Sequence, residues 1–203
     1  FLLNETAVIS DGFGGAICNY ADMTITNSTI SSNNAYIWGG GIYNSGTMTM
    51  TNCTVSTNTA ESNGGGIYNS GGTSTIINST FSENSGYSAG GIYNRADAIL
   101  NLTNTIIANS ILENPGGDCA NYGTINTNIS NLVEDGSCSA AYSGDPILGT
   151  LADNGGTTET HALLMGSPAI DAGSLAECPT TDQRGVTRPK GSGCDIGAFE
   201  NEL

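Results

Sequence analysis

A short repeat, with a period of about 25 residues, runs through the first two thirds of the chain and limits what this chain can fold into. One track reads Gly-Ile-Tyr-Asn in three of its four copies, and four evenly spaced isoleucines mark it: Ile17, Ile42, Ile67 and Ile92. A second track begins with an asparagine and returns at nearly the same spacing, at 27–30, 52–55, 78–81 and 104–107. A fixed short period indicates stacked, near-identical units. The repeat therefore excludes disorder for this part, despite its many Gly, Ser, Thr and Asn residues.

Each unit is too short for two helices and a turn, and its apolar residues alternate with polar ones. Met48/Met50 and Leu100/Leu102 are examples, and such alternation is typical of a strand with one buried face. Three short strands fit into each unit, separated by corners rich in Gly, Asn and Ser. The sequence therefore predicts an all-β fold: a right-handed parallel β-helix with three-strand rungs of about 25 residues each.

The repeat ends near residue 145. We interpret residues 1–145 as parallel β-helix rungs, with 1–13 as a partial rung before about five others. Residues 146–203 lack the repeat, and an open β-helix end exposes unpaired backbone groups. We therefore expect this segment to form an irregular C-terminal cap over the last rung. It holds three of the four cations: Arg184, Arg188 and Lys190. We expect its arginines to form buried or half-buried pairs with its carboxylates.

The C-terminal segment also carries a long string of motifs. They include Asp145-Pro146-Ile147-Leu148-Gly149, Gly166-Ser167-Pro168-Ala169-Ile170-Asp171-Ala172-Gly173, Thr181-Asp182-Gln183-Arg184-Gly185 and Cys194-Asp195-Ile196-Gly197-Ala198-Phe199-Glu200. This string resembles the choice-of-anchor Q domain, which lies at the C-terminal end of bacterial surface β-helix proteins. The resemblance implies a secreted, cell-surface protein of the right-handed parallel β-helix class.

The repeat also places identical side chains in columns along the predicted rod. Two columns are asparagines and one is tyrosine: Asn19, Asn44, Asn69, Asn94; Asn27, Asn52, Asn78, Asn104; and Tyr43, Tyr68, Tyr93. Stacked amides can hydrogen-bond from rung to rung, as in amide ladders, and stacked rings can pack against one another. We interpret the columns as structural ladders. The alternative is that the tyrosine and asparagine columns form a sugar-binding face.

The chain has six cysteines, which suit an oxidising compartment outside the cytosol. Cys119 and Cys138 are close in sequence, as are Cys178 and Cys194, so we predict one disulfide within each pair. Cys18 and Cys53 lie on different tracks, and the sequence leaves their pairing open. Phe1-Leu2-Leu3 already fits a rung, which predicts that any signal peptide has been removed.

The charge balance narrows the functions open to the chain. Four Lys and Arg residues stand against 19 Asp and Glu residues, a net charge of −15, which excludes a nucleic-acid partner. The apolar runs are too short to span a membrane. The acidic surface would also repel an acidic polysaccharide, and the rungs show no paired carboxylates for a glycosidase.

The remaining candidates for chemistry are isolated. His161 is the only histidine, and we expect it to be a packing residue rather than a catalytic base. Asp153-Asn154-Gly155-Gly156 offers oxygen ligands for calcium but lacks the alternating acidic spacing of a calcium-binding loop. We therefore predict no catalytic residue, no metal and no cofactor.

Together these features predict a non-catalytic, secreted structural protein of the cell surface. Phe1, Leu2 and Leu3 form the expected assembly edge, where an uncovered strand would join a neighbouring copy head to tail and build a fibre. The partner would then be the chain itself. The alternative function is an adhesin or carbohydrate-binding β-helix that contacts glycans, and a polysaccharide lyase or hydrolase ranks third.

Overall fold

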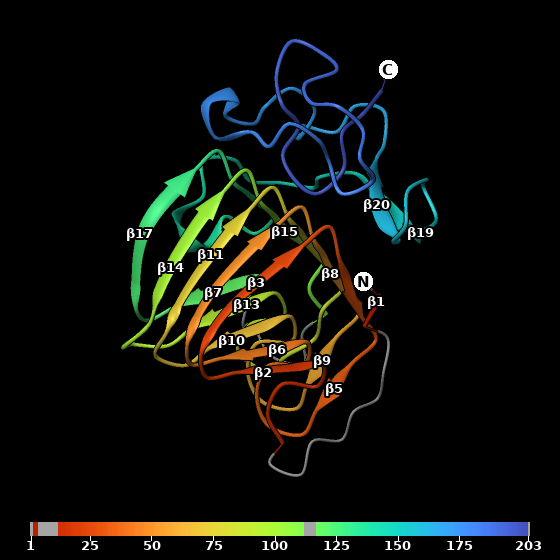
Figure 1. Cartoon of the computed structure of the whole chain (residues 1–203). Coiled ribbons are helices and arrows are strands. Elements are labelled where there is room, and N and C mark those ends of the chain that lie inside the picture. The colour runs from red at the N-terminus through yellow and green to blue at the C-terminus, as the bar shows by residue number, and fades with distance from the viewer. Residues whose placement is uncertain (1, 4–11, 112–116, 203) are drawn as a thin grey trace.

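The computed structural model describes residues 2–3, 12–111 and 117–202, and of residues 2–3 it describes only the backbone. The chain winds as a right-handed parallel β-helix whose rungs stack along one axis (Figure 1). The predicted fold class is confirmed. Among the described residues, helix is limited to two short 3-10 turns, η1 (Ser137–Ser139) and η2 (Leu175–Glu177).

Three parallel sheets form the faces of the rod. Sheet A contains β1 (Leu2–Leu3), β4 (Thr29–Ser31), β8 (Thr54–Ser56), β12 (Thr80–Ser82), β15 (Ile106–Ala108) and β18 (Leu132–Val133). Sheet B contains β2 (Ile17–Asn19), β6 (Ile42–Asn44), β10 (Ile67–Asn69), β13 (Ile92–Asn94) and β16 (Cys119–Asn121). Sheet C contains β3 (Asp22–Thr26), β7 (Thr47–Thr51), β11 (Thr73–Ile77), β14 (Ile99–Thr103) and β17 (Thr124–Ile129).

Two small sheets complete the fold. β5 (Asn34–Ala35) pairs in parallel with β9 (Thr59–Ala60) at the corner between sheets A and B. β19 (Leu148–Ala152) and β20 (Thr160–Leu163) form an antiparallel pair in the C-terminal part.

The period of the repeat becomes the strand register. Ile67 pairs with Ile42 on one side and Ile92 on the other, so successive rungs present equivalent positions of the repeat to the core, and four of them present isoleucine here. Val55 pairs with Phe81 in sheet A in the same way, and both side chains are fully buried. Among the described rungs the register slips once, after Leu100, where β17 carries an extra residue and forms a β-bulge.

The corner between sheets C and A explains why one asparagine track recurs. Asn27, Asn52, Asn78 and Asn104 all adopt positive φ angles, between 42° and 51°. Asparagine enters the left-handed region more readily than other residues with a Cβ. The left-handed backbone of this corner therefore explains why asparagine recurs in this track.

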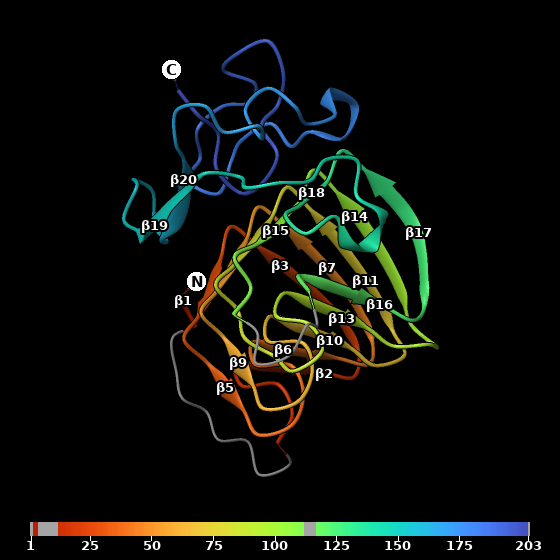
Figure 2. The same ribbon diagram turned by 180° about the vertical axis from the view of Figure 1, so that it is seen from behind.

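Residues 146–202, which we call the flank segment, lie beside the rungs and not over their end (Figures 1 and 2). The prediction of an end cap is therefore wrong. The flank segment covers the outer face of sheet A, where its Leu163, Ile196 and Phe199 pack with Ile106 and Leu132 in a second apolar core. The physical reason is that sheet A presents apolar side chains outward in its last two rungs, and these need a cover.

The end of the last rung is closed by the residues that directly follow it. Val133 N–H donates to Tyr142 O and Tyr142 N–H donates to Asn131 O, at 3.1 and 3.0 Å. Cys119 N–H in β16 donates to Ser137 Oγ at 3.0 Å. Residues 134–145 thus serve the end-covering role that we had expected of the C-terminal segment.

Candidate functional site

The first asparagine column forms a continuous ladder inside sheet B. Each Nδ2 group donates to the Oδ1 atom of the next rung, from Asn19 to Asn44 at 2.7 Å, Asn44 to Asn69 at 2.9 Å and Asn69 to Asn94 at 2.8 Å. Asn94 extends the ladder to Asn121 at 2.7 Å. The first four side chains are buried. The predicted rung-to-rung bonds are present, and this column is closed to a ligand.

The second asparagine column, which begins at Asn27, bonds mainly to the flank segment and not from rung to rung. Of its possible rung-to-rung bonds, the described residues contain one, from Asn104 Nδ2 to Asn78 Oδ1 at 3.1 Å. Asn52, Asn78 and Asn104 instead donate to carbonyl oxygens of the flank segment, at Thr181, Asp195 and Ser174, over 2.8, 3.2 and 3.1 Å. The exposed Asn27 contributes only its carbonyl, to Thr158 Oγ1 at 3.4 Å. The expected ladder is therefore largely replaced by a docking seam, because the left-handed corner directs these amides outward.

A third column escaped the sequence analysis. Asn33 Nδ2 donates to Asn58 Oδ1 at 2.9 Å, and Asn58 Nδ2 donates to Asn84 Oδ1 at 3.0 Å. All three side chains are buried. The signal was available, since these asparagines recur with the same period as the other two columns.

Gln183 is the central contact between the flank segment and the rungs. Its Oε1 accepts from Thr54 Oγ1 at 2.8 Å, and its Nε2 lies 2.9 Å from both Thr29 Oγ1 and Thr158 Oγ1. One rung further, Thr80 Oγ1 accepts from Ala198 N–H at 3.0 Å. A column of ordinary strand threonines on sheet A is thus the polar half of the docking surface.

His161 fastens another part of the flank segment to the rungs. Its side chain is 2% exposed, with Nδ1 2.8 Å from Gly149 O and Nε2 2.9 Å from Ser56 Oγ. Because a carbonyl oxygen can only accept, Nδ1 carries the proton and Nε2 accepts from the serine. Burial lowers the pKa of His161, which keeps the ring neutral. Both ring nitrogens are therefore used in packing the flank segment, the role we expected.

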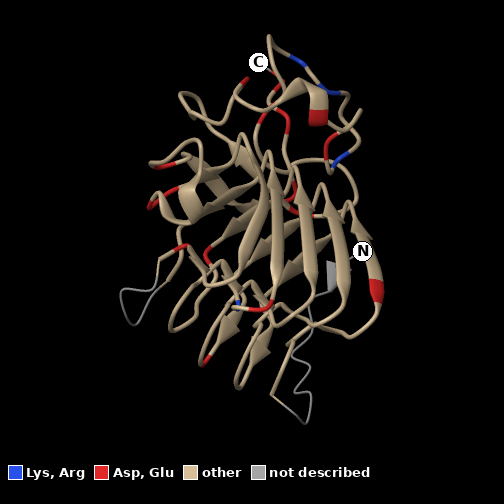
Figure 3. Ribbon diagram, turned by 90° about the vertical axis from the view of Figure 1, so that its left-hand side faces the viewer, with Lys and Arg blue, Asp and Glu red and all other residues tan. Residues whose placement is uncertain are grey.

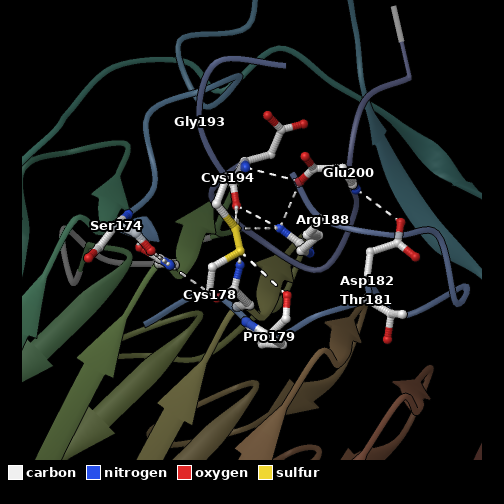
Figure 4. The surroundings of a disulfide bond; sticks show 12 residues. Ser174, Cys178, Pro179, Thr181, Asp182, Arg188, Gly193, Cys194 and Glu200 are labelled. Carbon is white, nitrogen blue, oxygen red and sulfur yellow. Dashed lines mark hydrogen bonds and ion pairs between the residues drawn. A yellow bond between two sulfur atoms is a disulfide. The ribbon is translucent and has the colours of Figure 1, made fainter. Parts of the chain in front are cut away.

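An ion-pair cluster holds the interior of the flank segment (Figure 4). Arg188 Nη1 lies 3.1 Å from Glu200 Oε2, with both side chains fully buried. The same guanidinium donates to Asp195 O at 2.8 Å and to Gly197 O at 2.7 Å. Arg184 pairs with the buried Asp182 at 2.8 Å. The expected Arg–carboxylate pairs are present.

Burial sets the protonation behaviour of this cluster. It lowers the pKa of Arg188 and raises the pKa values of Asp195 and Glu200, since each charged form loses solvent. Three of the chain's four cations lie in the flank segment (Figure 3). Within it, Lys190 contributes a backbone N–H to Glu200 Oε1 at 2.8 Å.

The tyrosine column stacks as predicted and is longer than predicted. Ring centroids of Tyr43 and Tyr68 are 5.8 Å apart and those of Tyr68 and Tyr93 are 5.0 Å apart, nearly parallel in both cases. Trp38 stacks on Tyr68 at 4.9 Å and Tyr122 tilts against Tyr93 at 5.3 Å. Tyr43 is 8% exposed and Tyr68 is 4% exposed. The rings cover one another, so the middle of this column offers no free ring face to a sugar.

Both predicted disulfides are present. Cys119 is bonded to Cys138 and ties β16 to the end-covering residues, while Cys178 is bonded to Cys194 within the flank segment. Cys18 and Cys53 are free thiols. Cys53 is buried in the core, and burial raises its pKa to about 11, so it is an inert packing residue.

The two ends of the rod differ. β1 pairs with β4 at the N-terminal side of sheet A, with Leu2 opposite Thr29 and Leu3 opposite Ile30, and Phe1 lies outside the described residues. Within the described ranges, β2 and β3 are the terminal strands of sheets B and C at this end. At the opposite end, residues 134–145 bond to β18 and β16, whereas β17 is the terminal strand of sheet C and has a strand neighbour, β14, on one side only within the described residues.

The turn considered for calcium is held by its own hydrogen bonds. Asp153 Oδ1 accepts from Gly155 N–H at 3.0 Å, and Asn154 Nδ2 donates to Thr160 O at 2.7 Å. Across the described ranges, no three His, Cys, Asp or Glu side chains are grouped to hold a metal ion. In the same part of the chain, no helix is long and apolar enough to cross a membrane.

Residues 52–70 match the Chlamydia polymorphic membrane protein repeat. The matched residues cover about one rung, including β8, β9 and β10. No curated protein and no solved structure matches the chain significantly. The match and the stacked rungs fit a repeat protein of the cell surface. Because the match lies in the rungs, the resemblance of residues 146–203 to the choice-of-anchor Q domain stays a prediction.

Proposed function

We propose that this chain is a non-catalytic, extracellular part of an adhesin-like surface protein, in which a stiff rod carries an exposed binding face. The observation that carries the proposal is where the reactive side chains lie. His161 and the pairs Arg188–Glu200 and Arg184–Asp182 all hold the flank segment. The buried histidine therefore acts in docking, and the buried arginine–carboxylate pairs act in the interior of the flank segment.

Two further observations support this proposal. The two disulfides fit an oxidising compartment, and the matched repeat takes its name from membrane proteins of Chlamydia. The ladders of Asn19, Asn33 and their copies, bonded from rung to rung, favour a rigid scaffold over a mobile active-site lid.

The proposal is tested by measuring polysaccharide binding and polysaccharide cleavage in the same samples. The purified chain is incubated with a panel of polysaccharides, and bound glycan is followed by calorimetry while released reducing ends and unsaturated sugars are assayed. We expect binding to at least one polysaccharide without product. Release of product that scales with protein concentration would overturn the non-catalytic assignment, and absence of any binding would overturn the adhesin-like one.

Self-assembly into a head-to-tail fibre is the second candidate, favoured by the edge of β3. Thr47 N–H donates to Ala21 O of the preceding rung. One rung earlier, Asp22 occupies the position of Thr47 and Thr24 occupies the position of Thr49, and N–H groups two residues apart in a strand point the same way. The N–H of Thr24 therefore lies on the outer edge, ready for strand addition. At the other end of the same sheet, β17 is also a terminal strand among the described residues, so in a head-to-tail fibre β3 of one copy would pair with β17 of the next.

Negative-stain microscopy and sedimentation velocity test the fibre. Thr24→Pro removes the outward N–H without removing a bond to the next rung, and Thr24→Ala is the matched control. We expect concentration-dependent filaments from the wild type and from Thr24→Ala, and single particles from Thr24→Pro. A wild-type chain that stays monomeric at high concentration would refute self-assembly.

A further inference from the structure

A second aromatic column, separate from the stacked one, is exposed at the corner between sheets A and B. Tyr36 directly follows β5 and Glu61 directly follows β9, and the pairing of Ala35 with Ala60 sets them one above the other. In the next rung, Ser85 pairs with Thr59, which brings Tyr87 to the corresponding position. Three successive rungs thus present tyrosine, glutamate and tyrosine.

Exposure distinguishes this column from the stacked tyrosines. Tyr36 is 70% exposed and Tyr87 is 53% exposed, whereas Tyr68 is 4% exposed. Within the described residues, Glu61 is exposed and enters no ion pair. The two rings and the carboxylate are therefore available to a ligand.

The surface is hollowed beside this column. A cavity of about 360 Å³ is lined by Thr59, Ala60, Glu61, Ser85, Gly86 and Tyr87. Tyr87 is held in place by its backbone N–H, which donates to Ser62 O. Hydroxyl groups, one carboxylate and one aromatic ring converge on a hollow within the size range of small-ligand sites.

The spacing of the column suits an extended polymer. Neighbouring rungs are about 4.8 Å apart, so Tyr36 and Tyr87, two rungs apart, lie about 10 Å from each other along the rod. An extended sugar chain parallel to the axis would place alternate units against the two rings. The intervening unit would direct its hydroxyl groups at Glu61.

Charge restricts the kind of sugar. The chain carries a net charge of −15. Further along the same corner, a second hollow is lined in part by three more acidic residues, Asp118, Glu134 and Asp135. A glycan with carboxylate or sulfate groups would be repelled, whereas hydroxyl or ammonium groups would be accepted.

We propose that Tyr36, Glu61 and Tyr87 form a binding site for an extended glycan without acidic groups, lying along the rod axis. This inference rests on the proposed adhesin-like function and assigns its ligand class and its site. It also moves the sugar-binding face away from the Tyr43, Tyr68 and Tyr93 column, where the sequence had placed the alternative.

Calorimetry on the full chain tests the site with five hexasaccharide probes: cellohexaose, maltohexaose and chitohexaose as neutral sugars, glucosamine hexamer as a cationic sugar, and hexagalacturonate as an acidic one. Tyr36→Ala and Tyr87→Ala should each weaken binding of a neutral or cationic probe about two- to tenfold, the usual contribution of one ring contact. Glu61→Gln should weaken the glucosamine hexamer more than any neutral hexamer.

Tyr122→Ala is the matched control, because Tyr122 is 64% exposed and belongs to the stacked column. Its binding should equal that of the wild type, and thermal melting should show all variants folded. Unchanged binding in the Tyr36→Ala/Tyr87→Ala double variant, or loss in Tyr122→Ala, would overturn this site while leaving the adhesin-like function in place. Binding of hexagalacturonate alone would overturn the ligand class, and binding of no probe would overturn the site.

Discussion

Replacing Asn58 by alanine should destabilise the rod more than any comparable change at its surface. The Asn58 side chain makes four hydrogen bonds: it accepts from the Asn33 N–H and Nδ2 groups at 3.1 and 2.9 Å, and donates to Ile30 O and Asn84 Oδ1 at 2.9 and 3.0 Å. It is fully buried, so no water replaces the lost partners.

The size of the effect follows from these bonds. A buried hydrogen bond contributes about 1 kcal/mol net, and an unpartnered buried donor costs about 1–3 kcal/mol. Asn33 N–H loses its partner, while Asn84 Oδ1 keeps the bond from Asn58 N–H at 3.0 Å. The four lost bonds and the unpartnered N–H together lower the expected free energy of unfolding by about 5–7 kcal/mol, a large share of the stability of a domain.

Urea unfolding followed by tryptophan fluorescence measures this loss, since Trp38 is the only tryptophan. Asn121→Ala is the control, because Asn121 ends the other ladder in an exposed position and accepts one rung-to-rung bond, at 2.7 Å. It should cost no more than about 1 kcal/mol. Equal midpoints for the two variants would refute the idea that buried amide ladders stabilise the rod.

Three further predictions concern the flank segment. Glu200→Ala leaves Arg188 buried without its partner and should lower stability by about 3–5 kcal/mol, visible in thermal melting; an unchanged melting temperature would contradict this. Replacing Cys178 and Cys194 together by alanine should cost about 3 kcal/mol and raise hydrogen exchange in residues 146–202 before the rungs, whereas a uniform rise would count against local docking. Burial lowers the pKa of His161, so the unfolded chain binds the proton more readily, and stability should fall as the pH drops below about 6.5, the unfolded value. His161→Asn should remove that fall in urea titrations between about pH 7.5 and 5.5, and a slope that persists would contradict the assignment.

The rungs could be predicted from the sequence because each residue of the rod meets its own copy. A parallel β-helix converts the period of the repeat directly into neighbouring strands, so the pairing of Ile42 with Ile67 can be read from that period. The tyrosine stack and the first asparagine ladder follow for the same reason. Asn33, Asn58 and Asn84 obey the same rule and could have been found.

The flank segment could not be placed in this way because its contacts have no period. Gln183 reaches Thr54 across 129 residues and Thr29 across 154, and nothing in the local sequence of a strand threonine marks it as a docking partner. The predicted ladder of the second asparagine column failed for a related reason. Its recurrence reflects a left-handed corner, and the repeat does not specify which way the amide of Asn52 points.

The flank segment also fixes the number of rungs it can accompany. It contacts four successive rungs, for example at Thr29, Thr54, Thr80 and Asn104. Duplicating one repeat unit between Thr29 and Asn104 would push these contacts out of step with the segment that binds them. Growth of such a protein by tandem duplication is therefore restricted to positions outside this span, so the C-terminal sequence sets the length of the rod section that it covers.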